Sequence, residues 1–264
     1  MSELVLTEQH GPVRVLWLND PRRANPLSPP LVERLTSELE EAAGSPGRVR
    51  AVVLTGKGKH FSAGADLAAL EAVASGGDVE ANRADSERLR RLFETLLDHP
   101  CLTVAAVHGA AVAGGCGLAT ACDLVVAERS SRFAYTEVRI GFVAALVLTF
   151  LVRRVPGHVA RRLLLDPEMI PGARAVELGL ADRLVEDGTA VGEAVAWAQR
   201  VAARTAPSAV SATKHLLNRV VGLSWREALA VAAEVNVSQR LHPECRRGVR
   251  SFLDSGRTPD WLED

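Results

Sequence analysis

The feature that most constrains this chain is the segment Thr103 to Gly117, TVAAVHGAAVAGGCG, in which an apolar run ends in small residues and a double glycine. The stretch LATACDLVV follows directly and has the composition of a helix. This pattern predicts a buried strand, a turn without bulky side chains and a helix. Backbone N–H groups in such a turn can approach a ligand oxygen closely. Glu137, in FAYTEVRIG, is the nearest downstream acidic residue at a predicted helix start, and it adds the carboxylate that proton chemistry beside a carbonyl group needs.

Composition narrows the possible partners. Hydrophobic residues make up 47% and charged residues 24% of the 264 residues, which is typical of a globular protein with ample material for a core. The net charge of −1 provides no field that would attract nucleic acid or an anionic membrane. An aromatic content of 4% also argues against base-stacking surfaces. We therefore expect no nucleic-acid partner and no membrane partner.

Cysteine usage and the N-terminus both predict a cytoplasmic protein. The four cysteines form no CxxC pair, and three lie among apolar or small residues, where a thiol behaves as a small hydrophobe. No basic segment followed by an apolar core precedes the first predicted strand, so no signal peptide is evident. The longest apolar run, Ile140–Val152, is too short to span a bilayer and is expected to form a buried helix. No cluster of His, Cys and acidic residues has the spacing of a metal site.

Strand and helix patterns alternate over the first part of the chain and predict an α/β fold with parallel pairing. The predicted strands are Leu4–Thr7, Val13–Leu18, Val49–Leu54, Leu102–Val107 and Leu124–Ala127. Helices are expected after Ser28, which precedes two prolines, and near Ala84–Leu97. We therefore assign residues 1–188 to an α/β core that carries the site.

Residues 189–264 carry only helical periodicity. The predicted helices are Ala190–Ala203, Pro207–Val221, Trp225–Ser238 and Pro243–Leu253. Exposed apolar faces on these helices would favour packing against another subunit, and packing within one chain explains the pattern equally well. We assign this part to a helical, oligomerisation region.

Two glycine turns follow two of the predicted strands. The first is GKGKHFSAGADL and the second is HGAAVAGGCGLA. Because parallel strands end at the same edge of a sheet, both turns can aim N–H groups into one crevice. Two N–H groups that converge on one oxygen form an oxyanion hole, in which each donor contributes about 3 to 4 kcal/mol to lowering a barrier. The donors expected here are the N–H groups of Ala65 and Gly114.

With these turns in view, the chain resembles the crotonase (enoyl-CoA hydratase/isomerase) superfamily. The resemblance rests on FSAGADL, AAVHGAAVAGGCGLATACDLVVA and FAYTEVRIGF, and it extends through ARAVELGLADRLV to the helical tail. It implies a spiral of ββα units with an all-helical C-terminal region that forms trimers, often paired into hexamers. It also implies an acyl-CoA thioester substrate, with no cofactor beyond the coenzyme A of that substrate, and an enolate held by Ala65 and Gly114. The substrate contacts that it implies are Ser62, Ala63, Gly64, Asp66, Leu67, Gly115, Tyr135 and Phe252.

Three departures from the family pattern bear on the chemistry. Hydratases with two catalytic carboxylates carry a glutamate where this chain has Gly117, whereas their second glutamate matches Glu137. The EVRxG motif with an apolar helix behind it resembles a bacterial enoyl-CoA or methylglutaconyl-CoA hydratase-like subgroup that also tends to lack the first glutamate. Phe252 matches a position that touches the adenine of coenzyme A from a neighbouring subunit, but the family lysine three residues later is Ser255.

The resemblance predicts an enoyl-CoA hydratase, a lyase that adds water across the 2,3 double bond. Glu137 would take a proton from water and deliver one to the α-carbon, and a helix start capped by Thr136 would favour its ionised form. With one carboxylate, hydration would be slow unless Tyr135, Asp66 or an acid from Glu71–Glu87 assists. Three alternatives remain: an enoyl-CoA isomerase, a catalytically weak acyl-CoA-binding homologue and a dinucleotide-dependent oxidoreductase. The last is the least favoured, because Thr120 stands where the dinucleotide-binding motif has its third glycine.

Several residues also have ordinary structural explanations. Asp66 is expected to cap a helix, Asp123 to anchor a turn from helix to strand, and His108 to form hydrogen bonds in a supporting role. Gly114 and Gly115 can permit close packing of helix against strand as well as ligand approach. Lys57 and Lys59 can neutralise phosphates of coenzyme A or simply be solvated.

Overall fold

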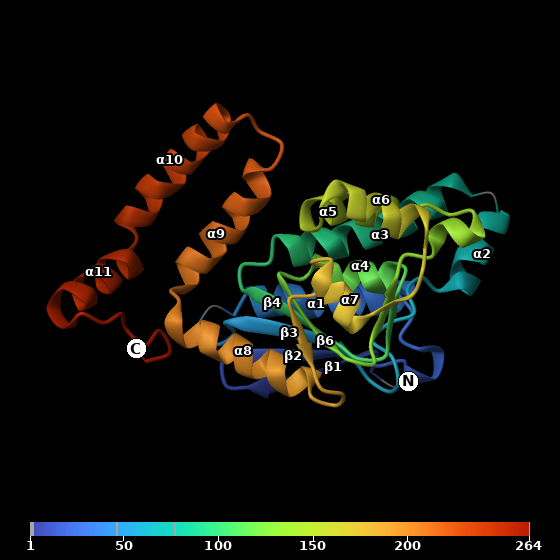
Figure 1. The fold of residues 1–264 in the computed structure, drawn as a ribbon, viewed down its shortest axis with the longest axis horizontal. Helices are drawn as coiled ribbons and strands as arrows, with labels where there is room; N and C mark the ends of the chain where they lie inside the picture. The colour runs from blue at the N-terminus through green and yellow to red at the C-terminus, as the bar shows by residue number, and fades with distance from the viewer. Residues whose placement is uncertain (1–2, 46, 77, 264) are drawn as a thin grey trace.

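A twisted six-stranded sheet forms the centre of the molecule (Figure 1). The computed structural model describes residues 3–45, 47–76 and 78–263. The strands are β1 (Val5–His10), β2 (Val13–Leu18), β3 (Ala51–Gly56), β4 (Leu102–Val107), β6 (Leu124–Glu128) and β9 (Arg183–Val185), in the spatial order β1-β2-β3-β4-β6-β9. β1 and β2 pair antiparallel, and the remaining neighbours in this sheet pair parallel. The predicted α/β class with parallel pairing is therefore confirmed.

Side chains along the central strands point alternately to the two faces of the sheet, so the core has two layers. Val52 and Leu54 of β3 belong to the larger apolar cluster, whereas Ala51 and Val53 belong to a smaller one. Successive side chains of a strand point to opposite faces, so both faces of β3 are buried. Such strands appear as continuous apolar runs in sequence, which is why β3 and β4 were predictable.

Helices cover both faces of the sheet. One face carries α1 (Pro29–Ala43) and α4 (Gly114–Ala121), and α3 (Val79–Leu97) packs on these two helices; buried apolar residues of all three belong to the larger cluster. The other face carries α8 (Ala190–Arg204), which presents a stripe of small residues to the strands: Ala190, Ala194 and Ala198. Their spacing of four residues puts them on one side of the helix, close against the valines of the sheet.

A second, three-stranded sheet was not predicted. It consists of β5 (Ala110–Val112), β7 (Arg132–Ala134) and β8 (Ile170–Pro171). Strands of two or three residues are too short to establish a periodicity, so only tertiary pairing defines them. The remaining elements are η1 (Pro21–Arg23), α2 (Leu67–Gly76), η2 (Glu137–Ile140), α5 (Ala145–Arg154), α6 (Gly157–Leu165) and α7 (Gly172–Glu177).

The prediction of a buried helix over Ile140–Val152 is wrong in two respects. The α-helix, α5, begins only at Ala145, because a 3₁₀ turn and a glycine in left-handed conformation precede it. Within this chain only part of the run is buried, since the side chains of Ile140 and Val143 are 58% and 61% exposed. Apolar composition alone does not predict which face of a helix packs against neighbouring residues. Within the described part of the chain, no helix has the length and apolarity to cross a membrane.

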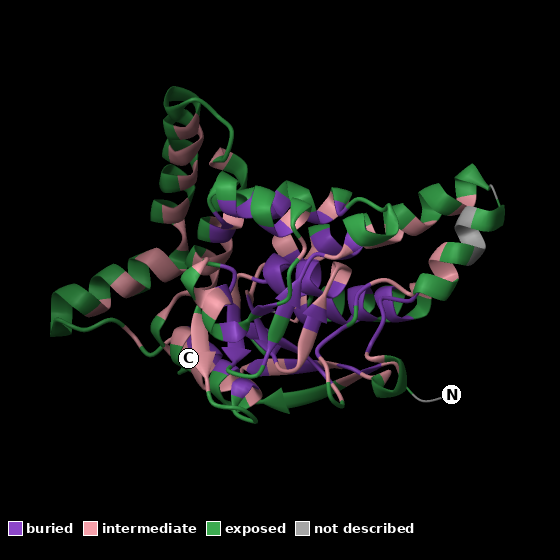
Figure 2. Ribbon diagram, turned by 45° about the vertical axis from the view of Figure 1, so that its right-hand side comes forward, coloured by how far each residue is buried: buried purple, intermediate pink, exposed green. Residues whose placement is uncertain are grey.

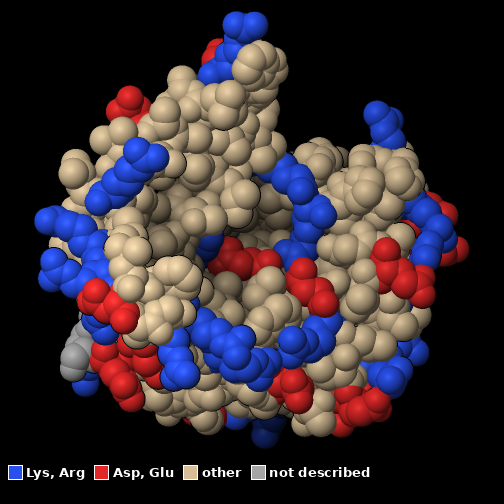
Figure 3. Space-filling model, turned by 60° about the vertical axis from the view of Figure 1, so that its left-hand side comes forward, with Lys and Arg blue, Asp and Glu red and all other residues tan. Residues whose placement is uncertain are grey.

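The last three helices form an arm that projects from the body (Figures 1 and 2). They are α9 (Pro207–Val220), α10 (Trp225–Leu241) and α11 (Pro243–Ser255). The described residues of α10 and α11 include none that is buried, and apolar side chains such as Trp225 and Leu253 are exposed. Figure 3 shows Lys and Arg side chains around a hollow on the side that carries this arm. The all-helical C-terminal region is confirmed, and its role in oligomerisation stays a prediction.

An ion pair with a buried lysine helps to attach the arm to the body. Lys214 of α9 is 8% exposed, and its Nζ lies 2.8 Å from Oδ2 of Asp123. Asp123 also accepts a hydrogen bond of 2.7 Å from the backbone N–H of Thr103, so it anchors the turn between α4 and β6 as expected. α8 packs on the sheet and α9 leaves it, so the arm begins after α8.

Candidate active site

The two glycine turns meet at one end of the sheet. Gly64 has φ +87°, and a methyl group at this position would lie 2.6 Å from the carbonyl oxygen of Val112 and 3.0 Å from the backbone nitrogen of Gly114. A single parallel bridge pairs Ala65 with Leu27, which holds the first turn in place. The N–H groups of Ala65 and Gly114 therefore belong to facing turns that are in van der Waals contact. Glycine is required at position 64 both for its backbone conformation and for this approach.

The second turn stores backbone strain directly before Gly114. Ala113 has φ +50° and ψ −127°, a conformation that residues with a Cβ atom rarely adopt. Its N–H donates to the carbonyl oxygen of Ala134 at 2.8 Å, so the smaller sheet holds it in place. Strain of this kind persists only where the surroundings over-determine the backbone, and it is concentrated at functional sites.

Asn25 organises the first turn, although it is not part of any motif along the chain. Its side-chain amide is fully buried and donates to the carbonyl oxygens of Lys57, His60 and Phe61 at 3.0, 2.9 and 3.1 Å. Its backbone carbonyl accepts a hydrogen bond of 2.8 Å from the hydroxyl of Ser62. An isolated asparagine has no spacing pattern, so only the fold reveals that it holds this loop.

A cavity of about 530 Å³ lies against the two turns. Of the residues predicted to form the site, it brings together Ala63, Ala65, Asp66, Leu67, Gly114 and Glu137. Further walls come from residues in or next to α1, α3, η2 and α5, including Leu27, Phe93, Phe142, Val143 and Val147. Residues from four separate parts of the chain therefore surround one space.

Five predicted contact residues do not line this cavity, and Gly64 is one of them, because it faces the second turn instead. Ser62 is fully buried, and its hydroxyl is used within the loop, where it also accepts the N–H of Gly64 at 3.2 Å. Gly115 supports the turn from behind, because a methyl group there would lie 2.5 Å from the carbonyl oxygen of Ser62. Phe252 is exposed on α11, in the arm.

Tyr135 is the fifth, and its side chain lies in the core rather than on the wall of the cavity. The side chain is 1% exposed within the larger apolar cluster, and its hydroxyl pairs with that of Thr120 at 2.9 Å. Burial raises the pKa of Tyr135 well above its ordinary value. The phenol therefore supports the core beneath the site and is not placed to assist water.

Glu137 is the carboxylate of the site. It is 7% exposed, and Oε2 has no hydrogen-bond partner among the described residues. Burial raises the pKa of Glu137 above 4.5, and a backbone hydrogen bond opposes this shift only in part. The expectation that a helix start would favour the ionised form is therefore wrong, because η2 is a single 3₁₀ turn and Thr136 makes no side-chain cap. A buried carboxyl group with a raised pKa is typical of an acid–base catalyst.

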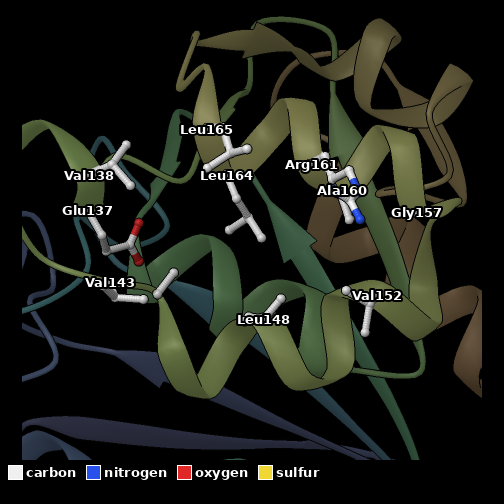
Figure 4. Close-up of a pocket in the computed structure, with 11 residues that line it drawn as sticks. Glu137, Val138, Val143, Leu148, Val152, Gly157, Ala160, Arg161, Leu164 and Leu165 are labelled. Atoms are coloured by element: carbon white, nitrogen blue, oxygen red, sulfur yellow. The ribbon is translucent and has the colours of Figure 1, made fainter.

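Glu137 also reaches a second, apolar cavity of about 410 Å³ between η2, α5 and α6. Figure 4 shows its carboxylate directed into this space, which is walled by Val143, Leu148 and Leu164. Two cavities with apolar walls therefore share one carboxylate, and this arrangement accounts for its desolvation.

The other acidic side chains at the larger cavity already have cationic partners. Oδ2 of Asp66 lies 2.7 Å from Nη1 of Arg23, and Oδ1 of Asp66 accepts the N–H of Ala69 at 3.4 Å, as a weak helix cap. Asp85, from the segment expected to offer a helper acid, lies 3.0 Å from Arg88. Both carboxylates are thereby committed to ion pairs, so among the described carboxylates that line this cavity Glu137 is the one without a cationic partner.

Other singled-out residues have structural partners. His108 Nε2 lies 3.1 Å from the carbonyl oxygen of Gly58, which agrees with its supporting role. Lys57 Nζ lies 3.3 Å from the centre of the Trp17 ring and 3.4 Å from Glu8. Burial raises the pKa of the Cys116 and Cys122 thiols to about 12, so they behave as small hydrophobes. Within the described ranges, no group of His, Cys and acidic residues is arranged to hold a metal ion.

Comparisons with known proteins agree with this geometry. Residues 8–264 match the family described as Enoyl-CoA hydratase/isomerase. A Thermus thermophilus protein named "Putative enoyl-CoA hydratase" is 47% identical over 93% of this chain and 96% of its own length. The 2,3-dehydroadipyl-CoA hydratase of Escherichia coli is 30% identical over 99% of both chains.

Solved structures agree as well. A crystal structure described as an enoyl-CoA hydratase from Polaromonas superposes with a TM-score of 0.89 at 30% identity, covering 97% of this chain and 98% of that one. Another, described as an enoyl-CoA hydratase/isomerase (crotonase) from Legionella pneumophila, gives 0.86 at 32% identity over 98% of each chain. The fold, the whole-chain match and the resemblance in motif lead to the same conclusion: this chain belongs to the enoyl-CoA hydratase/isomerase family and has the crotonase fold.

Proposed function

We propose that this protein is an enoyl-CoA hydratase in which Glu137 is the only acid–base group. The thioester oxygen accepts hydrogen bonds from the N–H groups of Ala65 and Gly114, where the charge of the enolate develops. Glu137 takes a proton from water as the hydroxyl adds to the β-carbon, and it returns that proton to the α-carbon. The atoms of one water molecule are thereby divided between the two carbons.

The observation that carries this proposal is the position of the unpartnered Oε2 of Glu137 in the same cavity as the two facing turns. Its raised pKa suits the role, because a base is most effective when its pKa lies near the working pH. The names of the relatives support an acyl-CoA thioester as substrate. We further propose that Phe252 meets the nucleotide end of coenzyme A from a neighbouring subunit in a trimer or a pair of trimers.

The test is hydration of a short and a branched 2-enoyl-CoA by the purified protein and by its Glu137→Gln variant. We expect the variant to retain thioester binding and to lose roughly 10²–10⁴-fold in kcat, the usual contribution of a general acid–base group. Calorimetric titration with the thioester measures the binding. If the wild type binds the thioester but adds no water, the proposal fails, and a 3-enoyl-CoA then separates an isomerase from an acyl-CoA-binding role.

The second candidate is an enoyl-CoA double-bond isomerase, and one observation favours it. Gly117 is buried in α4 and lies against Val147, so no second carboxylate reaches Glu137 from this position. One carboxylate suffices to remove a proton from one carbon of an allylic system and return it to another. Conversion of a 3-enoyl-CoA into the 2-enoyl-CoA, without an accompanying hydration activity, would select the isomerase.

A further inference from the structure

Val147 occupies the space into which a side chain at position 117 would extend. A Cβ atom built on Gly117 would lie 2.4 Å from Cγ2 of Val147 and 3.4 Å from its Cγ1. Val147 is 4% exposed on α5 and lines the same cavity as Glu137. The two residues therefore fit together: glycine on α4 accommodates the valine of α5, and the valine excludes anything larger than glycine.

This contact determines how well the cavity can hold a water molecule. An ordered water in a protein interior makes about three hydrogen bonds to polar partners. The α5 side of the cavity offers apolar side chains instead, from Phe142, Val143 and Val147. Asp66 and Asp85 are engaged by arginines. Glu137 is left as the one carboxylate in this cavity that is not committed to an ion pair.

Movement of a proton between Glu137 and the α-carbon has no such requirement. The carboxylate removes a proton from that carbon, the electron pair is delocalised onto the thioester oxygen, and the same proton or one from solvent returns. No second water-binding group takes part. The two reactions therefore differ in their need for a positioned water, although they share the carboxylate and the oxyanion hole.

We propose that Val147 is a specificity-determining residue that sets the ratio of water addition to α-proton exchange. Its methyl groups offer a nucleophilic water no polar partner on the α5 side of the cavity, so hydration is slow relative to proton exchange in the wild type. The inference rests on the proposed role of Glu137, and it adds the residue that limits what this carboxylate can do.

Two rates measured on each variant test the proposal. The first is hydration of crotonyl-CoA, and the second is exchange of the α-protons of butyryl-CoA in D₂O, followed by NMR. The second substrate has no double bond and reports proton transfer alone. Val147→Thr keeps a similar volume and adds one hydroxyl group. We expect it to raise the hydration-to-exchange ratio roughly fivefold, the worth of one ordinary hydrogen bond.

Two further variants test the steric half of the argument. Gly117→Glu alone is expected to unfold at a lower temperature than the wild type, because its side chain meets Val147. Gly117→Glu combined with Val147→Gly is expected to recover stability and to give a higher hydration-to-exchange ratio than the wild type. Val155→Ala is the matched control for truncation of a valine, since Val155 is equally buried at 4% but does not line the cavity.

The outcomes separate this inference from the proposed function. An unchanged ratio in Val147→Thr and in the double variant, with both proteins folded, overturns the role of Val147 alone. If Glu137→Gln keeps the wild-type rate of α-proton exchange, the proposed function fails instead. If Val155→Ala changes the ratio as much as the Val147 variants do, the effect is one of general packing and the inference is wrong.

Discussion

The larger cavity has two walls of different construction. The backbone wall consists of Ala63, Ala65, Ala113 and Gly114, and it is fixed by the neighbouring glycines, the strained backbone of Ala113 and hydrogen bonds from Asn25. The side-chain wall consists of residues 137–147, where Glu137 and apolar side chains face the cavity. The backbone wall presents dipoles that no substitution can change without moving the chain. The side-chain wall can be altered one residue at a time, so we infer that it sets which reaction follows from a common enolate.

The largest effect should come from disturbing the backbone wall. Gly64→Ala places a methyl group 2.6 Å from the carbonyl oxygen of Val112 in a left-handed conformation. We expect kcat to fall about 10²–10³-fold, as when one oxyanion-hole donor is lost. Gly222→Ala is the control, because its φ of +91° imposes similar strain with no neighbour within 4 Å. Equal kcat values for Gly64→Ala and the wild type would show that the backbone wall has no role in catalysis.

Glu137, in the side-chain wall, should determine how activity depends on pH. Burial raises the pKa of Glu137 above 4.5, so the acid limb of kcat/KM should lie above that pH. Below the raised pKa, the ionised fraction of Glu137, and with it the rate, should fall about tenfold per pH unit. A profile measured on a 2-enoyl-CoA checks this. If the acid limb lies at or below the ordinary glutamate pKa, or is unchanged in Glu137→Gln, a group other than Glu137 causes it.

The same shift predicts how stability depends on pH. Because the folded state holds the Glu137 proton more tightly than the unfolded state, its contribution to stability is full below pH 4.5 and is lost as the pH rises through the raised pKa. Glu137→Gln carries no such charge, so it should unfold at higher denaturant concentration than the wild type at about pH 8 and should lose this advantage at about pH 4. If Glu137→Gln is more stable than the wild type by the same amount at both pH values, burial of the Glu137 charge is not the cause.

The smallest effect should come from substitution of Tyr135, whose side chain lies in the core beneath the cavity. Tyr135→Phe removes the hydrogen bond to Thr120, whose hydroxyl retains the carbonyl oxygen of Cys116 as acceptor at 2.9 Å. We expect a loss of about 1 kcal/mol in the free energy of unfolding, with kcat unchanged. Urea unfolding and steady-state hydration measure the two quantities. A large fall in kcat at unchanged stability would return Tyr135 to the substrate site.

The parts of the fold that could be predicted are those with a long, repeating pattern. The apolar runs of β3 and β4 and the helical periodicity after residue 189 are visible in sequence because burial on both faces, or on one stripe, recurs over many residues. β5, β7 and β8 have two or three residues each and were missed. The exposure of Ile140 and Val143 was missed because it depends on which neighbours cover α5.

The sequence by itself determined the family, the α/β core with its helical tail and the two turns that meet near Glu137, because these follow from glycine spacing and hydrophobic periodicity along the chain. Only the tertiary structure decided the environment of each side chain. It put Tyr135 in the core, revealed Asn25 as the centre of the first turn and placed Val147 over Gly117. Burial and contact depend on residues distant in sequence, so the raised pKa of Glu137 and the space beside it exist only once α4, η2 and α5 have packed together.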